Sequence, residues 1–241
     1  MSFLVRAITL DLDDTVWPFA PIAERIERVL DDWLRAHCPR TADRFPAAAM
    51  RTLREQVFAE HPQLAHDLST LRRMTLERAL RESGDDPAHA EAAWEVFYAV
   101  RNQVECYPDS VAALERIAAR VPVAAVTNGN ADLARIGLDA HFRFNLTSRE
   151  HGRAKPSACI FHAACARLEC AHGEVLHVGD HIEMDVAGAA RAGLRSCWIN
   201  REGRDWAHPE IDPDLQFDTL AALADWLDAH TAPRHDRTAP A

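Results

Sequence analysis

Short apolar runs recur along the chain, and each ends in polar residues that are followed by a helical pattern. The first run, Val5–Leu10, leads directly into the acidic segment Asp11–Thr15, which reads Asp-Leu-Asp-Asp-Thr. Strands that alternate with helices form a parallel sheet covered on both faces. The pattern therefore predicts an α/β fold with a doubly wound parallel sheet. The later runs that we predict as strands are Val121–Val126, Phe142–Leu146, Val175–Val178 and Arg195–Ile199.

Helical patterns separate these runs and follow the last of them. Proline at the first turn of one helix and Gly193 after the end of another are the expected boundary residues. Asp109 or Ser110 is a plausible N-cap of the first helix in this part of the chain. The predicted helices are Asp109–Arg120, Ala131–Ile136, Pro156–Leu168, Ile182–Ala192 and Thr219–Ala229, with a loose tail from Pro233.

The segment from Pro21 to about Cys106 differs, because it shows helical periodicity and almost no strand signal. Its apolar residues fall into four stripes at the spacing of an amphipathic helix, separated by proline- and glycine-containing breaks. We therefore predict a helical unit of four helices, residues 19–106, inserted after the first strand. The α/β core would then consist of residues 1–18 and 107–241.

Composition limits the functions that need to be considered. The 241 residues carry a net charge of -10, which repels polyanions and argues against a nucleic-acid partner. No apolar stretch approaches the length of a membrane span, and Met1–Leu10 lacks the features of a secretory signal. The six cysteines form no CxxC pair, so we expect free thiols and a cytoplasmic protein. The oligomeric state is not indicated.

Two carboxylates mark the end of the first strand. Asp11 and Asp13 are two positions apart, so on a strand their side chains would point the same way. Like charges held close together are costly unless they share a proton or a cation. Mg²⁺, which prefers oxygen ligands, would relieve that cost.

Further polar groups follow the later strands. Ligands of doubly wound sheets bind beyond the carboxyl ends of the strands, where all of these groups would lie. Thr127, Asn128 and Gly129 offer a hydroxyl and backbone N–H donors suited to a phosphate. Lys155 would counter negative charge, although a lysine alone is more often a solvated surface residue. Gly179-Asp180 ends another strand. Asp185 follows in the next helix, where its carboxylate either supports a metal site or only stabilises the helix N-terminus through the helix dipole.

This ordered set resembles the haloacid dehalogenase superfamily of phosphohydrolases. The resemblance spans Val5 to about Leu227, and the helical insertion looks like the family's helical cap. The four matching motifs are DxDxT at Asp11–Thr15, the hydroxyl residue Thr127, the lysine Lys155, and Gly-Asp followed by an acid at Asp180 and Asp185.

The resemblance implies a Mg²⁺-dependent phosphatase that acts on small phosphomonoesters. Asp11 would be the nucleophile and Asp13 the acid and base. The metal ligands would be Asp11, the backbone carbonyl of Asp13 and Asp180, with Asp185 supporting them. Thr127, Asn128, Gly129 and Lys155 would hold the phosphoryl group, and Trp17 would contact the substrate.

Related chemistries fit less well or remain open. Dehalogenases of the family lack an acid at the position of Asp13, and phosphonatases place a lysine in the cap, whereas Pro21–Cys106 contains none. A sugar-phosphate mutase keeps both aspartates, so the motif does not exclude it. A phosphoacceptor signalling module uses similar residues, but it carries its acceptor on the third strand and has no such insertion.

The resemblance also suggests a substrate. The segments around Thr127, Lys155 and Asp180 look like a bacterial branch that acts on flavin mononucleotide and on a phosphorylated ribitylaminouracil precursor of riboflavin. A nucleotide is another possibility. Aromatic residues of the insertion could stack on a flat ring, but most of them lie on apolar stripes, where core packing is their expected role.

Overall fold

A computed structural model describes residues 3–230, and its centre is a six-stranded sheet in which every neighbouring pair of strands is parallel. The strand order is β3-β2-β1-β4-β5-β6. The predicted doubly wound parallel sheet is therefore confirmed. The strands are β1 (Ala7–Leu10), β2 (Val123–Thr127), β3 (Asn145–Thr147), β4 (Val175–Gly179), β5 (Arg195–Ile199) and β6 (Leu215–Phe217).

Every residue of β1 is buried, as expected for a central strand that is covered on both faces. Its apolar sequence supplies side chains to both layers of helices. The edge strand β6 was not predicted, because it is only three residues long and half-exposed, with a polar residue at its centre. The elements of this part of the chain are α6 (Ser110–Arg120), α7 (Leu133–Ile136), η2 (Asp139–His141), α8 (Ser148–His151), α9 (Ala158–Leu168), η3 (His172–Glu174), η4 (Ile182–Ala187), α10 (Gly188–Arg191) and α11 (Leu220–His230).

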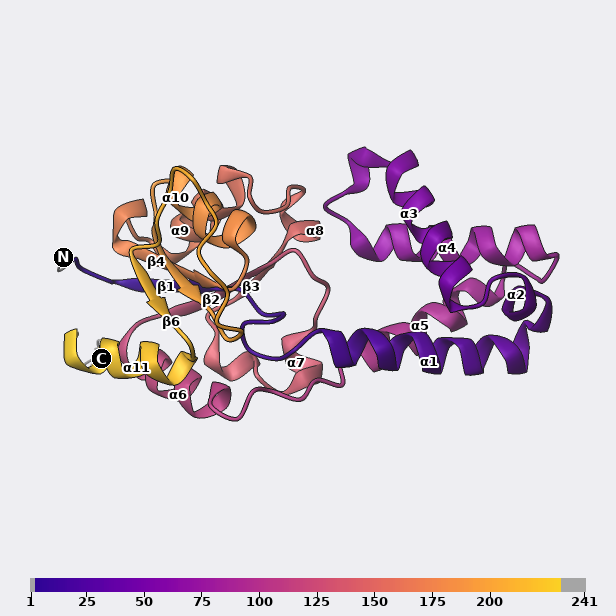
Figure 1. Cartoon of the computed structure of the whole chain (residues 1–241), viewed down its shortest axis with the longest axis horizontal. Coiled ribbons are helices and arrows are strands. Elements are labelled where there is room, and N and C mark those ends of the chain that lie inside the picture. The colour runs from indigo at the N-terminus through magenta and orange to yellow at the C-terminus, as the bar shows by residue number, and fades with distance from the viewer. Residues whose placement is uncertain (1–2, 231–241) are drawn as a thin grey trace, which may run out of the picture. The chain divides into compact units, whose positions relative to one another are not determined.

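Helices cover both faces of the sheet (Figure 1). Helices α6 and α11 pack against each other on one face, and α9 and α10 lie on the other. The second face encloses an apolar cluster in which Phe161 and Ile160 of α9 are fully buried. The predicted helix Ile182–Ala192 is in fact two elements, the π-helix η4 and the short α10. The predicted tail from Pro233 lies outside the described residues.

The chain contacts divide the molecule into two compact units. Among the described residues, the α/β unit comprises residues 3–17, 106–128 and 137–230, and the helical unit comprises residues 18–105 together with residues 129–136. The proposed boundaries thus differ from these contacts mainly at 129–136, a segment that follows β2 in sequence. The helices inserted after β1 are α1 (Ala20–His37), α2 (Pro39–Arg44), α3 (Ala47–Glu60), η1 (Pro62–Leu64), α4 (Leu68–Ser83) and α5 (His89–Arg101).

Periodicity explains how the helical unit forms its core. Ile22, Ile26, Leu30 and Leu34 recur every four residues on α1, and all four are buried. Their spacing places them on one face of the helix, so that α1 buries an apolar stripe against its neighbours. Within residues 3–230, no helix is long and apolar enough to span a membrane.

Asp109 connects three parts of the α/β unit. It stands at the N-cap of α6 as predicted, but its side chain does not cap that helix. Instead, the carboxylate accepts hydrogen bonds from the Leu220 and Ala221 amides at the start of α11, at 2.9 and 3.2 Å. Arg201 also donates to it at 2.9 Å, and the same guanidinium donates to the Thr15 carbonyl. One carboxylate therefore holds α11 and the Arg201 loop to the start of α6.

We expect Asp109→Asn to lower the free energy of unfolding by about 1–3 kcal/mol, because it removes the charge that accepts these bonds. Burial raises the pKa of Asp109, but the hydrogen bonds and charge of Arg201 outweigh it, so the pKa is lowered. A depressed folded-state pKa contributes stability that is present above the unfolded-state value and is lost as pH falls through the folded value. The difference between wild type and variant should therefore shrink below about pH 4.

Urea unfolding between about pH 7 and about pH 3 measures this difference. Asp225→Asn is the matched control, because Asp225 also pairs with an arginine but its side chain is 71% exposed. That control should change stability by less than about 1 kcal/mol at any pH. Equal losses in the two variants would contradict the assigned role of Asp109.

Candidate active site

Asp11 lies at the carboxyl end of the central strand. The register pairs Leu10 with Val178, and the Asp11 amide donates to the Val178 carbonyl at 2.9 Å. Asp11 is therefore level with Gly179, the last residue of β4. Its side chain is buried, with the residue 8% exposed, so its environment is set by its neighbours rather than by solvent.

Lys155 joins two of the acids. Its Nζ donates to Asp11 Oδ1 and to Asp185 Oδ1, each at 2.6 Å, and the residue is 3% exposed. Burial alone would lower the pKa of the ammonium, but the two carboxylates outweigh burial and raise it. Burial raises the pKa of Asp11 despite Lys155, whereas Lys155 and His177 outweigh burial and lower the pKa of Asp185. The cluster therefore contains a stable ammonium between two carboxyl groups.

The composition of the chain also sets this lysine apart. Lys155 is the only lysine of the chain, and the other 26 of its 27 basic residues are arginines. An ammonium is a compact point charge, whereas a guanidinium is a planar fork of five donors. A buried position between two carboxylates suits the smaller group, which explains a lysine here in an arginine-rich protein.

Asn128 holds the backbone of Lys155 in place. Its side-chain amide donates to the Lys155 carbonyl at 3.0 Å, and its Oδ1 accepts from the Lys155 amide at 2.8 Å. Thr127 is the last residue of β2 and is 1% exposed, close to the strand end where Asp11 lies. Gly129 belongs by its contacts to the helical unit, so its role in binding phosphate stays a prediction.

Asp180 is anchored from two directions. Thr15 donates to its carboxylate at 3.2 Å, and the indole of Trp198 donates to its carbonyl at 2.8 Å. Burial is the main cause that raises the pKa of Asp180 to about 7, and the charge of Asp185 adds to it. A carboxyl group in this state would be stabilised as an anion by a cation nearby.

Asp11, Asp180 and Asp185 together form a candidate metal site. Each offers a carboxylate oxygen, and these atoms lie within 4.8 Å of one another. Hard oxygen donors with excess negative charge suit a hard divalent cation, so the cluster can hold a metal ion. The resemblance implies a supporting role for Asp185, whereas the structure places its carboxylate in the same group as those of Asp11 and Asp180.

Asp13 occupies a different environment. Its carboxylate is not among the three that converge, and its Oδ1 accepts a hydrogen bond from the Trp17 indole at 2.8 Å. Trp17 is fully buried, so its ring presents no exposed surface to a substrate. The geometry gives Trp17 a contact that holds Asp13, and a contact between Trp17 and a substrate stays a prediction.

Two buried residues of the sheet, Thr9 and His177, form a chain of hydrogen bonds that ends at Asp185. The motifs do not include either residue. Thr9 Oγ1 lies 2.9 Å from His177 Nδ1, and His177 Nε2 lies 3.1 Å from Asp185 Oδ1. Burial lowers the pKa of His177, which favours its neutral form. The sequence signal was only a histidine within an apolar strand, which by itself does not distinguish packing from support of a site.

Gly179 allows Asp185 to approach the strand. A Cβ atom at Gly179 would lie 2.3 Å from Asp185 Cγ, which is too close for any side chain. Asp185 comes from the π-helix η4, and its Oδ2 also accepts from the His181 amide at 3.0 Å. Such π-helical turns are frequent at functional sites.

Comparison with known proteins agrees with this geometry. A sequence model of the haloacid dehalogenase-like hydrolases matches residues 5–193. The chain is 32% identical to the 5-amino-6-(5-phospho-D-ribitylamino)uracil phosphatase YigB of Escherichia coli, over 91% of the chain and 94% of that protein. It is 33% identical to a phosphoserine phosphatase of Thermus thermophilus, over 84% and 76% of the two chains.

One solved structure is also similar in sequence. The crystal structure of a 2-haloacid dehalogenase from Pseudomonas syringae pv. tomato is 34% identical, covers 94% of this chain and 99% of its own, and superimposes with a TM-score of 0.87.

The chain belongs to the haloacid dehalogenase-like hydrolases. The predicted family is therefore confirmed, and the predicted enzyme class agrees with the two curated phosphatases that the chain resembles.

We expect Gly179→Ala to displace Asp185 and to separate it from Lys155, because the added methyl group needs the space that the carboxylate occupies. Overpacking of this kind costs about 1–3 kcal/mol in the free energy of unfolding. We also expect MgCl₂ to raise the Tm of the wild type and to leave the Tm of the variant unchanged. Thermal unfolding with and without added MgCl₂ measures both effects.

Gly173→Ala is the matched control, because a Cβ there would meet no atom within 4 Å. It should retain the wild-type stability and the wild-type response to MgCl₂. A Gly179→Ala protein with an unchanged response would show that the position of Asp185 does not matter to metal binding.

Proposed function

We propose that this protein hydrolyses small phosphomonoesters through a phosphoaspartyl intermediate on Asp11. The observation that carries the proposal is the convergence of Asp11, Lys155 and the two other acids at the carboxyl ends of β1 and β4. A buried carboxylate beside an ammonium and a set of oxygen ligands is suited to receive a phosphoryl group.

In the first step, a carboxylate oxygen of Asp11 attacks phosphorus in line with the ester oxygen. The bond from Asp11 to phosphorus forms as the bond from phosphorus to the leaving oxygen breaks. Lys155 holds Asp11 through Oδ1, which leaves Oδ2 as the proposed nucleophile. The leaving alkoxide takes the proton of Asp13 and departs as an alcohol.

In the second step, Asp13 accepts a proton from water, and the water oxygen attacks the phosphorus of the intermediate. The bond between Asp11 and phosphorus breaks, which releases inorganic phosphate and restores the Asp11 carboxylate and the protonated Asp13. The same residue serves in both steps because the first proton transfer leaves it as a base. The Trp17 indole, 2.8 Å from Asp13 Oδ1, would keep this carboxylate in place while Oδ2 exchanges the proton.

The remaining groups would bind the phosphoryl oxygens. Thr127, the amides of Asn128 and Gly129, and the ammonium of Lys155 are the proposed contacts. Asn128 would act in addition by fixing the backbone of Lys155. We propose Mg²⁺ as the metal, held by Asp11, Asp180 and the Asp13 carbonyl with Asp185 beside them; when bound it would neutralise charge on the transferring oxygens.

For the substrate we propose 5-amino-6-(5-phospho-D-ribitylamino)uracil or flavin mononucleotide. The support is the similarity to the Escherichia coli phosphatase YigB, whose name gives the first of these compounds and which aligns with nearly the whole chain. Both compounds carry their phosphate at the end of a ribityl chain, so the same chemistry at phosphorus would serve either. A nucleotide or another small phosphomonoester is the broader alternative.

Dehalogenation is the second candidate, and the Pseudomonas syringae structure is the observation that favours it. A carboxylate nucleophile such as Asp11 can displace halide from carbon as well as attack phosphorus. Halide leaves without a proton, however, so that reaction gives Asp13 no task. The contact between Asp13 and Trp17 favours phosphoryl transfer to water, for which a positioned acid is required.

We expect Asp13→Asn to lower kcat about a hundredfold to ten-thousandfold, because the variant has no proton to donate to the leaving oxygen. KM should change little if binding depends on the phosphoryl contacts. Release of inorganic phosphate from flavin mononucleotide in the presence of MgCl₂ provides the measurement, and Asp11→Asn should abolish it.

Asp14→Asn provides the control for that experiment. Asp14 is exposed and has a positive φ of 60°, a conformation that asparagine also adopts. It should retain nearly the wild-type rate. A comparable loss in Asp14→Asn would mean that the segment responds to any substitution and that Asp13 has no special role.

A direct comparison of substrates separates the two candidate reactions. We expect phosphate release from the ribityl phosphates and no halide release from 2-chloropropionate by the wild type, because Asp13 is suited to protonate an alkoxide. Ion chromatography for halide and a colorimetric assay for phosphate, run on one enzyme preparation, give both rates. Halide release that survives Asp13→Asn, without phosphate release, would establish the dehalogenase instead.

A further inference from the structure

The connection between β5 and β6, residues 200–214, contains an arginine to which the proposed reaction gives no part. The side chain of Arg201 is 11% exposed, so it is a mostly buried cation of the α/β unit. None of the sequence motifs includes this connection. Its contacts nevertheless lead to the acidic segment Asp11–Thr15 and, through that segment, to Asp180.

Arg201 holds the last residue of the acidic segment. Its Nε and Nη2 both donate to the Thr15 carbonyl, at 3.2 and 3.0 Å. Its Nη1 donates to Asp109 at 2.9 Å, and its guanidinium carbon lies 3.9 Å from the centroid of the Tyr107 ring. A planar guanidinium that is held by a carboxylate and an aromatic ring has a fixed direction. The Thr15 backbone is therefore tied to a rigid donor.

Thr15 in turn contacts the carboxylate of Asp180. Thr15 is fully buried, and its hydroxyl donates to Asp180 Oδ1 at 3.2 Å. The backbone of Asp180 is held separately, because Trp198 and Arg204 donate to its carbonyl at 2.8 and 3.2 Å. The contact with Thr15 is thus the one of these three that orients the carboxylate, which belongs to the candidate metal site.

We propose that Arg201 is a positioning residue for the candidate metal site, which holds the Thr15 carbonyl and thereby directs the Thr15 hydroxyl to the Asp180 carboxylate. Residues that orient the ligands of a metal ion commonly change metal affinity tenfold to a hundredfold when they are replaced. The consequence of Arg201 for catalysis rests on the proposed phosphatase reaction. Its effect on metal binding is measured without substrate and does not.

The sign of the effect separates positioning from charge. A guanidinium near three acids repels a divalent cation, so a purely electrostatic role predicts tighter metal binding when Arg201 is replaced by a neutral residue. Positioning predicts weaker binding, because Thr15 and the Asp180 carboxylate lose their fixed orientation. The two roles therefore predict opposite changes in one measured affinity.

Electron paramagnetic resonance of free Mn²⁺, recorded during titration of the protein without substrate, measures this affinity. Mn²⁺ is a suitable probe because it prefers oxygen ligands, as Mg²⁺ does. We expect Arg201→Met to weaken Mn²⁺ binding about tenfold. Arg201→Lys keeps the charge and can still donate to the Thr15 carbonyl, so it should weaken binding less than Arg201→Met does.

Thr15→Val tests the same chain of contacts from its other end. Valine has nearly the shape of threonine and keeps the carbonyl that Arg201 binds, but it lacks the hydroxyl that donates to Asp180. It should weaken Mn²⁺ binding about tenfold, also if Arg201→Met folds poorly. The double variant should lose no more than the larger single loss, because both residues act through one contact.

Arg195→Met is the matched control. Arg195 also pairs with an aspartate, Asp214 at 2.9 Å, but it lies at the amino end of β5, away from the site. It should bind Mn²⁺ as the wild type does. Release of phosphate from flavin mononucleotide with MnCl₂ is measured in parallel. Metal binding that Arg201→Met weakens, without phosphate release by the wild type, would support this proposal and refute the proposed phosphatase reaction.

Three results would overturn the role of Arg201. One is no measurable binding of Mn²⁺ to the wild type. Another is wild-type or tighter binding in either Arg201→Met or Thr15→Val. The third is an equal loss of affinity in Arg195→Met, which would show that any broken arginine–aspartate pair in this unit disturbs the site.

Discussion

The contact between the Lys155 ammonium and two buried carboxylates is the interaction on which the site depends. Isolated charges are costly to bury, and a lysine between Asp11 and Asp185 compensates for part of that cost. The same contact fixes the distance between the end of β1 and the helix that follows β4. Removing Lys155 would leave two buried carboxylates without their ammonium partner, whereas removing either acid would leave the ammonium with one carboxylate.

Three neighbouring residues position Lys155 and Asp185 for the contact between them. Gly179 has no side chain, so Asp185 can lie against the end of β4. Asn128 binds both backbone groups of Lys155 and thereby aims its side chain from the loop after α8. His177 supports Asp185 from inside the sheet. The site is therefore rigid because each charged group is held by a second residue, as precise positioning of reacting groups requires.

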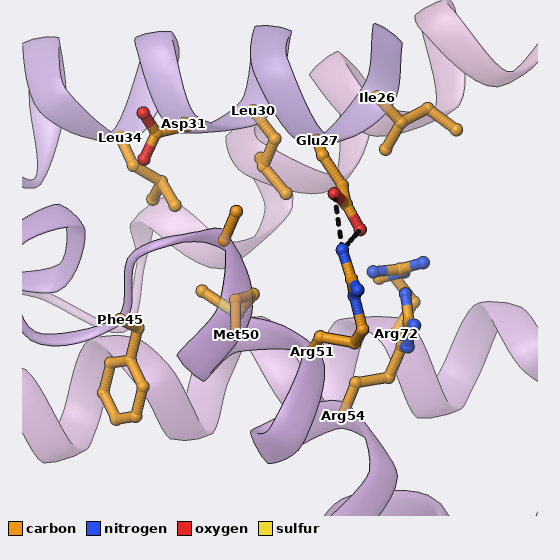
Figure 2. Close-up of a pocket in the computed structure, with 11 residues that line it drawn as sticks. Ile26, Glu27, Leu30, Asp31, Leu34, Phe45, Met50, Arg51, Arg54 and Arg72 are labelled. Carbon is orange, nitrogen blue, oxygen red and sulfur yellow. Dashed lines mark hydrogen bonds and ion pairs between the residues drawn. The ribbon is translucent and has the colours of Figure 1, made fainter. Parts of the chain in front are cut away.

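The helical unit contains a different kind of charge arrangement. In the α/β unit, the buried ammonium of Lys155 pairs with two carboxylates. In the helical unit, Arg54 and Arg72 line a pocket (Figure 2) and form no ion pair with a described residue. Aromatic residues of the helical unit take part in this arrangement indirectly. Trp94 and Phe97 are buried and lie under Arg73 and Arg72, so they pack the core and hold guanidinium groups.

The sequence by itself determined the parallel sheet, the family and the order of the strands and helices apart from the edge strand β6 and the division of residues 182–191 into η4 and α10. Those features follow from local periodicity and from motifs at strand ends, such as Asp11–Thr15, which need no knowledge of distant contacts. Only the tertiary structure decided that Asp185 joins the acid trio, that Trp17 faces Asp13 rather than solvent, and that Arg54 and Arg72 share a pocket. The physical reason is that burial and charge pairing depend on which residues the fold brings together across the sequence, and the pattern of one segment does not contain that information.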